Sequence, residues 1–317
     1  MWKILGFLQK HLIYSIPASM IAGVMTGYFF EVSFLRVMIL PLTFLMIYPM
    51  MVNLQIRKIF SGGDAKVQLA TFLINFGVIP FLAYGTGLIF FAHEPKMALG
   101  LLMIGLIPAS GMTISWTGFG KGNLDAAIKM TVIGLVSGAL LTPLYAEWLM
   151  GAVIDIPMTE IFQRILLIVF LPMLAGFLTQ RYLISNYGRE KFRSGISRKF
   201  PLLSSLGVLG VVFVAMALRA GVIIAEPLML LYILLPLLVF YGIIFSISTL
   251  IGKHFFPKAD GIALVYGSVL RNLSVALAVA LAVFGPEGAD IVLVISLAYI
   301  IQVQAAAWYM RFLGRIF

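Results

Sequence analysis

The sequence contains no cysteine, and only 11% of its 317 residues are charged. A chain without cysteine forms neither disulfides nor thiolate metal sites. Soluble globular proteins carry about 25% charged residues, so the charges here are too few to cover a water-facing surface. The composition therefore excludes a soluble enzyme. The three histidines, His11, His93 and His254, are too scattered for a metal site, and we expect no metal or other cofactor.

What the sequence does contain is long apolar stretches, and 62% of its residues are hydrophobic. A helix that spans a bilayer needs about 20 apolar residues, and ten such segments fit into the chain. Segments of this length without alternating polarity predict helices and not transmembrane strands. We expect spans at about 11–30, 34–53, 67–91, 97–117, 124–150, 160–183, 201–222, 226–252, 259–284 and 289–313.

The lysines and arginines indicate the orientation of these spans. With a cytoplasmic amino terminus, sixteen basic residues fall in inside segments and four fall outside, namely Arg36, Lys96, Arg164 and Arg219. Cytoplasmic loops carry such an excess of lysine and arginine, so the net charge of +10 indicates orientation and no nucleic-acid partner. We predict a multi-pass protein of the cytoplasmic (inner) membrane with both termini in the cytoplasm.

The ten spans divide into two halves with a weak internal similarity. Residues 16–23 in span one are IPASMIAG, and residues 171–176 in span six are LPMLAG. Because five is an odd number, the second half must insert upside down, and inverted repeats are typical of secondary transporters. We predict a single membrane domain with repeat one at 1–155, or 1–183 when the first span of repeat two is included, and repeat two at 156–317.

Spans four and nine occupy equivalent places in the two repeats, and both contain residues that disrupt helices. Span four has Gly105, Pro108, Gly111 and Gly118, and span nine has the run YGSVLRNLS at 266–274. Interrupted helices at matching places surround the substrate in many transporters, whereas small residues also serve ordinary helix packing. The polar Ser, Arg and Asn of span nine favour a substrate site.

These features resemble the bile acid/sodium symporter superfamily, which includes arsenite exporters of the Acr3 type. The resemblance covers essentially the whole chain and implies an all-α fold of ten spans, with two inverted repeats of five and discontinuous helices crossing at spans four and nine. The run LMIYPMM at 45–51 is similar to the arsenite-exporter branch. Gly122-Asn123 resembles the Gly-Asn that follows the symporters' span-four motif, and Arg271-Asn272 stands where they carry Gln-Asn.

The departures from this family concern its sodium and arsenite chemistry. The resemblance implies former sodium-site positions at Asn75, Thr113, Ile114, Thr131, Gly267 and Arg271. The family's glutamate is replaced by Gly267 and a key asparagine by Ile114, so the site has lost its negative charge and we expect no sodium coupling. The arsenite exporters depend on a span-four cysteine, and this chain has none, so arsenite export by thiolate chemistry is not expected.

Two basic residues, Lys129 and Arg271, fall inside predicted spans five and nine. A charge at the bilayer centre costs about 2.5–3.5 kcal/mol, and we predict that these two replace the sodium charges and favour an anionic substrate. For Lys129 the alternatives are an i,i+4 pair with Asp125, snorkelling to the interface, or transfer of a proton, which a buried lysine releases readily. For Arg271 the alternative is that carbonyl groups of the broken helix satisfy it.

The sequence therefore predicts a secondary transporter, not an enzyme, that moves a small organic anion by alternating access without sodium. The predicted substrate-binding residues are Arg271, Asn272, Lys129, Ser110, Thr113 and Ser268. The alternatives are a proton-coupled metalloid or oxyanion exporter of the Acr3 type, an ordinary sodium-coupled organic anion symporter, and, from another class, a channel or a membrane receptor. The expected partners are the small anion and the lipid bilayer, and no protein partner is predicted.

Overall fold

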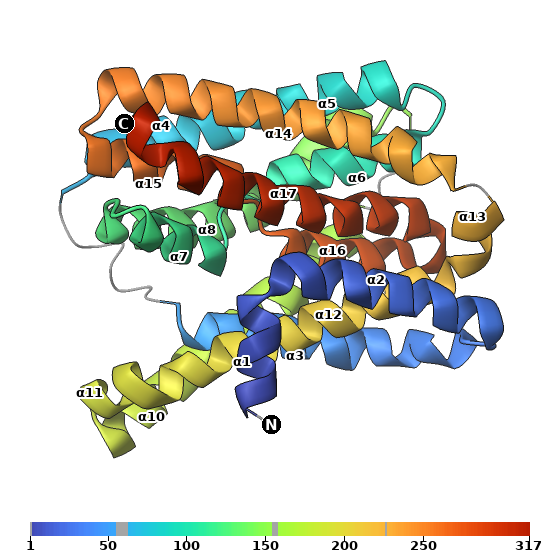
Figure 1. Cartoon of the computed structure of the whole chain (residues 1–317), viewed down its shortest axis with the longest axis horizontal. Helices are drawn as coiled ribbons and strands as arrows, with labels where there is room; N and C mark the ends of the chain where they lie inside the picture. The colour runs from blue at the N-terminus through green and yellow to red at the C-terminus, as the bar shows by residue number, and fades with distance from the viewer. Residues whose placement is uncertain (1, 55–62, 154–157, 226) are drawn as a thin grey trace. The chain divides into compact units, whose positions relative to one another are not determined.

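The computed structural model describes residues 2–54, 63–153, 158–225 and 227–317. Within these ranges the chain is helical almost throughout (Figure 1). It forms two compact units, each made of three stretches of sequence. Unit 1 comprises Met1–Leu54, Glu160–Leu230 and Leu277–Leu293, and unit 2 comprises Gln55–Thr159, Leu231–Ala276 and Val294–Phe317.

Unit 1 contains the amino-terminal helices and the middle of the chain. Its elements are α1 (Trp2–Lys10), α2 (Leu12–Phe29), η1 (Ser33–Met38), α3 (Ile39–Val52), η4 (Leu166–Phe170), α10 (Leu171–Tyr187), α11 (Arg189–Lys191), η5 (Phe192–Ile196), η6 (Ser197–Lys199), α12 (Phe200–Leu218), α13 (Ala220–Ala225) and η7 (Gly285–Gly288), with most of α9 (Met158–Ile165). Helix α12 packs against both α2 and α3, and α10 packs against α3. On α2, a Cβ atom at Gly27 would lie 2.0 Å from the Ala217 carbonyl oxygen, so the glycine permits this close approach of α2 and α12.

Unit 2 contains the interrupted helices. Its elements are α4 (Ala65–Leu73), η3 (Ile74–Val78), α5 (Ile79–Phe90), α6 (Pro95–Leu106), α7 (Gly111–Phe119), α8 (Leu124–Met150) and α15 (Lys258–Val269), with most of α14 (Leu228–Phe255) and α17 (Ala289–Ile316) and the start of α16 (Leu273–Phe284). Helix α8 packs against α4, α6, α7 and α15, and α15 also contacts α4 and α7. This packing places α8 beside three of the four half-helices, namely α6, α7 and α15.

The helices agree with the coarse sequence prediction of an all-helical polytopic membrane protein. Six of the described helices are long and apolar enough to cross a bilayer: Ala65–Phe90, Leu124–Met150, Thr159–Tyr187, Arg189–Leu218, Leu228–Phe255 and Ala289–Ile316. Three shorter apolar helices are Pro41–Val52, Pro95–Leu106 and Leu273–Phe284. The predicted boundary between the repeats, at residues 155 and 156, lies outside the described residues.

Segments four and nine are both broken, and local backbone chemistry explains the first break. Pro108 has no N–H to donate and disfavours helical geometry in the residue before it. Ile107 accordingly has φ −111° and ψ 88°, and Ala109 is left-handed with φ 53°. The second break has no proline; Leu270 leaves the helix with φ −85° and ψ 94°.

Candidate functional site

The two helix breaks lie against each other within unit 2. We call residues 107–110 and 270–272 together the break site. Pro108 and Arg271 form an isolated antiparallel bridge, and the Asn272 backbone N–H donates to the Ile107 carbonyl oxygen at 2.8 Å. Backbone groups released by one interrupted helix are thus satisfied by the other, as a membrane interior requires.

Arg271 is fully buried in the break site, with no exposed surface. Its Nε donates to the Ile104 carbonyl oxygen at 3.1 Å, and its Nη2 donates to the Gly105 carbonyl oxygen. Its Nη1 donates to the Ser268 carbonyl oxygen at 2.9 Å and to Oδ1 of Asn75. Four oxygen atoms therefore surround the guanidinium, which matches the alternative that carbonyl groups of the broken helices satisfy the charge.

The electrostatics of the helix ends explain why a cation is stable at this place. The carbonyl oxygens of Ile104 and Gly105 belong to the last turn of α6, and that of Ser268 belongs to the last turn of α15. Each helix carries about half a negative charge at its carboxyl end. A single guanidinium contacts both ends, so its positive charge offsets two helix dipoles that would otherwise face each other.

The backbone of Arg271 is fixed by an amide from α17. Oε1 of Gln302 accepts from the Arg271 backbone N–H at 2.8 Å, and Nε2 of Gln302 donates to the Arg271 carbonyl oxygen at 3.1 Å. The Tyr241 hydroxyl donates to the same Oε1 at 2.9 Å. The side-chain amide of Gln302 thus satisfies the backbone N–H and carbonyl groups of Arg271, which a continuous helix would otherwise pair with its own backbone.

The amino ends of two half-helices also begin at the break site. At the start of α7, Oγ of Ser110 accepts from the Met112 N–H at 3.2 Å, and the Ser110 N–H donates to Oγ1 of Thr113 at 3.1 Å. At the start of α16, Oδ1 of Asn272 accepts from the Val275 N–H at 3.3 Å. Helix amino ends carry partial positive charge and bind anions. Ser110, Thr113 and Asn272, three predicted substrate contacts, therefore lie where an anion is favoured.

Ser268, a further predicted substrate contact, has an unsatisfied hydroxyl. The residue is fully buried, and its Oγ has no hydrogen-bond partner within the described part of the chain. A buried polar group without a partner costs about 1–3 kcal/mol. Such a group is a candidate to bond with a ligand.

The structure brings together some of the positions that the sequence predicted as former sodium-site positions. Nδ2 of Asn75 donates to the Gly267 carbonyl oxygen at 3.1 Å, while its Oδ1 accepts from Arg271. Thr131 donates to the Ala127 carbonyl oxygen at 2.8 Å. Asn75, Gly267 and Arg271 are therefore direct neighbours, whereas the contacts of Thr131 run along its own helix and, at 3.5 Å, to the Ser110 carbonyl oxygen. Ile114 is half-buried on α7 and adds no polar atom.

A π-helical segment places Asn75 in this site. Pro80 has no N–H, so the Phe76 carbonyl oxygen loses its helical donor. The Tyr145 hydroxyl supplies the missing donor at 2.6 Å. Asn75 lies in the π-helical η3 that precedes α5, and single π turns are frequent at functional sites.

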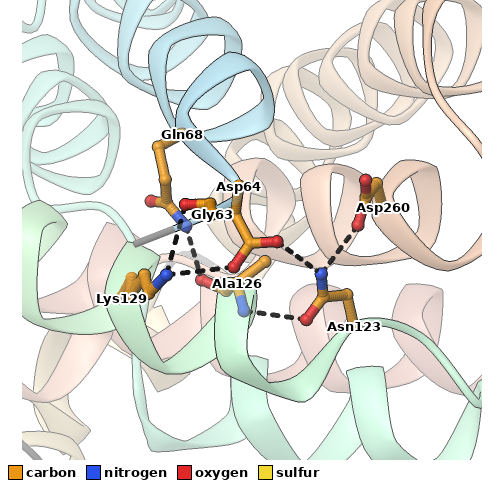
Figure 2. Close-up of polar contacts among 7 residues, drawn as sticks. All are labelled: Gly63, Asp64, Gln68, Asn123, Ala126, Lys129 and Asp260. Carbon is orange, nitrogen blue, oxygen red and sulfur yellow. Dashed lines mark hydrogen bonds and ion pairs between the residues drawn. The ribbon is translucent and has the colours of Figure 1, made fainter. Parts of the chain in front are cut away.

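Lys129 is held by a different group of residues (Figure 2). It is 3% exposed, and its Nζ lies 3.1 Å from Oδ2 of Asp64 and 3.3 Å from the Gly63 carbonyl oxygen. The sequence analysis named Asp125 as a possible partner of Lys129 and did not name Asp64. The contacts that hold Lys129 therefore differ from those that hold Arg271.

Asn123 links Asp64 to a second carboxylate (Figure 2). Its Nδ2 donates to Oδ1 of Asp64 at 2.9 Å and to Oδ1 of Asp260 at 2.8 Å, and its Oδ1 accepts from the Ala126 N–H at 3.0 Å. These polar residues stand at or next to the amino ends of α4, α8 and α15, where carboxylates are stabilising. We name Asp64, Asn123, Lys129 and Asp260 the polar cluster. Asp64, Asn123 and Asp260 could have been found from the sequence, because each is an acid or an amide that stands just before a predicted span or in its first turn.

Comparison with known proteins decides the family. Residues 40–226, more than half of the chain, match the model of the Sodium Bile acid symporter family. The chain belongs to the sodium bile acid symporter family. This confirms the resemblance that the interrupted segments and the span-two run predicted.

Individual relatives of this sodium bile acid symporter family member are transport or resistance proteins. It is 24% identical to the "Arsenical-resistance protein Acr3" of Alkaliphilus metalliredigens over 78% of this chain and 75% of the relative. It is 22% identical to an uncharacterized transporter of Synechocystis over 76% and 69%. It is 28% identical to the probable chloroplastic sodium/metabolite cotransporter BASS1 of Arabidopsis thaliana over 37% and 29%. Together with its apolar helices, these relatives make the protein a membrane transporter.

Proposed function

We propose that the protein is a sodium-independent secondary transporter of small organic anions, with built-in cations in place of bound sodium. The observation that carries this proposal is the guanidinium of Arg271, which lies among four oxygen atoms at the ends of two half-helices. The proposal includes alternating access, ten spans in two inverted repeats at 1–155 and 156–317, and an inner-membrane location with both termini in the cytoplasm.

The ligand chemistry supports this exchange of one cation for another. A metal cation such as sodium is held by oxygen atoms of carbonyl, amide and hydroxyl groups. The guanidinium of Arg271 has the same kinds of neighbours, namely three backbone carbonyl oxygens and the amide oxygen of Asn75. Arginine stays charged in proteins, so the positive charge at the helix ends is permanent. In this proposal Arg271 acts on the substrate through its charge and through the position of the break site.

The anion itself would bind at the amino ends of α7 and α16. Ser110, Thr113 and Asn272 supply short polar side chains there, and the dipoles of α7 and α16 favour negative charge. Ser268, in the last turn of α15, would add its unsatisfied hydroxyl. Lys129 contributes the second built-in cation in this proposal. Its salt bridge to Asp64 supports a structural role for that charge, and transfer of a proton by this pair is the proton-coupled alternative.

A second candidate is supported by the arsenical-resistance relatives. Two of them, from Alkaliphilus metalliredigens and Corynebacterium glutamicum, are 24% and 21% identical to this chain. Because this chain lacks cysteine, such export would need oxygen or nitrogen contacts to a metalloid oxyanion. The partial similarity to a sodium/metabolite cotransporter keeps sodium-coupled organic anion transport as a third candidate.

The central test compares thermal unfolding of the purified protein in sodium chloride and in choline chloride. An ion that binds only the folded state of a protein raises its melting temperature. We expect no difference between the salts for the wild type. Arg271→Gln restores the uncharged amide of the related symporters and should unfold at a lower temperature in choline, with partial recovery in sodium. Arg271→Lys, which keeps the charge, is the control and should stay insensitive to sodium.

The substrate is tested by uptake into proteoliposomes. We expect a small carboxylate to be transported at equal rates in sodium and choline. Transport of arsenite or another oxyanion alone would favour the second candidate. A clear increase of the wild-type melting temperature in sodium, or carboxylate uptake that requires sodium, would contradict the built-in cation and return the protein to the sodium-coupled transporters.

A further inference from the structure

A cavity of about 500 Å³ lies within unit 1, and none of its lining residues belongs to the break site or the polar cluster. Its volume falls within the range of about 300–1,000 Å³ found for pockets that bind organic ligands. Most of its wall is aliphatic, with Ile39, Ile168 and Leu281 among the lining residues, and the polar side chains that line it are Thr43, Arg164 and Arg219. Among the described lining residues there is no carboxylate and no aromatic ring.

Arg219 lines this cavity and has an unsatisfied donor. The residue follows the carboxyl end of α12, and its Nη2 donates to Oδ1 of Asp290 in the first turn of α17. Its Nε is buried and has no acceptor within the described ranges. A guanidinium has a planar set of donors that matches a carboxylate, so Arg219 retains a donor for a second anion.

Thr43 also lines the cavity and has an unsatisfied hydroxyl. The residue is 6% exposed, and its Oγ1 has no partner in the part of the chain that the structure describes. Thr26, Thr71 and Thr131 instead donate to the carbonyl oxygen four residues earlier, each at 2.8 Å. Most buried polar groups have a partner, so the hydroxyl of this cavity-lining residue is a candidate to bond with a ligand.

Arg164 adds a second positive charge at the wall. Its Nη2 lies 3.3 Å from Oε1 of Glu160, and both side chains are nearly half exposed, at 43% and 45%. An exposed pair of this kind binds weakly, so the arginine can turn to an anion in the cavity. With the predicted orientation of the spans, Arg164 and Arg219 both stand at the outer side of the membrane.

We infer that this cavity binds an aliphatic monocarboxylate. The carboxylate accepts from the Arg219 Nε and the Thr43 hydroxyl, Arg164 contributes positive charge, and the hydrocarbon tail packs against the aliphatic wall. The inference goes beyond the proposed function, because it requires binding and not transport and uses no residue of the break site. The ligand can come from water, as octanoate would, or from the bilayer, as a long-chain fatty acid would.

The test measures binding to the full-length protein in phosphatidylcholine nanodiscs. The probes are octanoate, octan-1-ol as its uncharged counterpart, and oleate added to the bilayer, and the readout is the affinity from calorimetry together with the melting temperature. We expect octanoate or oleate to bind and octan-1-ol not to bind measurably. Octanoate binding would indicate a ligand from water, and binding of oleate alone would indicate one from the bilayer.

Matched variants assign the binding to this cavity. Loss of a hydrogen bond to a charged ligand weakens affinity about tenfold or more, which we expect for Arg219→Gln and Thr43→Val. Thr43→Val removes an unsatisfied hydroxyl, so the unliganded protein should unfold at the same or a higher temperature. The controls are Arg181→Gln and Thr26→Val, which alter an exposed arginine and a half-buried threonine of unit 1.

Three results would overturn the inference. They are equal binding of octan-1-ol, octanoate affinity that is unchanged in both Arg219→Gln and Thr43→Val, and absence of binding by both acids to the wild type. These results are independent of the sodium test, since Arg271 variants should retain the binding of octanoate even where transport is lost.

Discussion

At the scale of single residues, the two buried cations are held by different chemistry. Arg271 donates to uncharged backbone and amide oxygens, whereas Lys129 faces the carboxylate of Asp64. A planar guanidinium can reach several oxygens at once, while an ammonium is a compact point charge. The break site therefore keeps a net positive charge, whereas the polar cluster pairs one ammonium, that of Lys129, with two carboxylates, those of Asp64 and Asp260.

The salt bridge in the polar cluster should contribute measurably to folding. Removing the charge of Asp64 weakens a bond to a nearly buried ammonium, and we expect Asp64→Asn to lower the free energy of unfolding by about 1–3 kcal/mol. Chemical or thermal unfolding in detergent measures this. Asp260→Asn is the matched control, because Asp260 bonds to Asn123 and its loss should cost less. In a double-mutant cycle with Lys129→Met, a coupling energy near zero between positions 64 and 129 would contradict the pair.

Lys129 has two possible roles, as a fixed charge or as a carrier of protons, and its replacement by arginine distinguishes them. If the Lys129–Asp64 pair is structural, uptake by Lys129→Arg and by wild type should respond to pH in the same way, because arginine keeps the charge and cannot release its proton. Initial uptake rates in proteoliposomes at acid and alkaline pH measure this. A pH dependence that disappears in Lys129→Arg while transport continues would instead support proton coupling.

Sequence reasoning identified the buried cations but not all of their partners. Lys129 and Arg271 stand out because charged residues are rare in apolar segments. Asp64 is 65 residues away from Lys129, and spacing along one helix indicated only Asp125. The acceptors of Arg271 are mostly backbone carbonyl oxygens, which every residue has, so the sequence could indicate their kind but not their positions.

At the scale of elements, glycine spacing on α8 allows the first helix break to pack closely. Gly134 and Gly138 are four residues apart, a spacing that membrane helices use for close contact. A Cβ atom at Gly138 would lie 3.0 Å from Cδ of Pro108 and 3.2 Å from the Leu106 carbonyl oxygen. The close packing of the break site therefore depends on the absence of side chains at Gly134 and Gly138 of α8 as well as on its own residues.

A larger side chain at Gly138 should displace the break. Overpacking costs about 1–3 kcal/mol, and we expect Gly138→Val to lower the melting temperature and to reduce transport strongly. The control is Gly242→Val on α14, where an added Cβ would meet no atom within 4 Å. Equal melting temperatures and transport rates for the two variants would contradict this role of α8.

The elements themselves were largely predictable from sequence. Long apolar segments have few options in a bilayer, so their helical state follows from composition. Pro108 also predicted an interruption by its missing N–H. The second break has no proline, and its prediction rested on Gly267 and on the place of span nine, which is equivalent to that of span four. The π-helical turn around Asn75 was not predicted, because it depends on a tertiary bond from Tyr145 to the Phe76 carbonyl oxygen.

At the scale of the whole molecule, the lack of cysteine makes the predicted orientation directly testable. A membrane-impermeant thiol reagent has no site on the native chain. On intact cells we expect the reagent to label Ser33→Cys, between the first two predicted spans, and not Ser194→Cys, in the predicted cytoplasmic loop. Both positions are exposed, so permeabilised cells should label both. Labelling of Ser194→Cys alone on intact cells would reverse the proposed orientation.

The buried guanidinium of Arg271 also limits the energy that this carrier could use. A sodium ion drives accumulation because it enters from the side where it is concentrated and leaves on the other. A cation that is covalently part of the chain returns with the protein in every cycle and transfers no charge of its own from one compartment to the other. With only such cations at the break site, the distribution of the substrate at rest would follow its own electrochemical gradient, and net flux would reverse when that gradient is reversed.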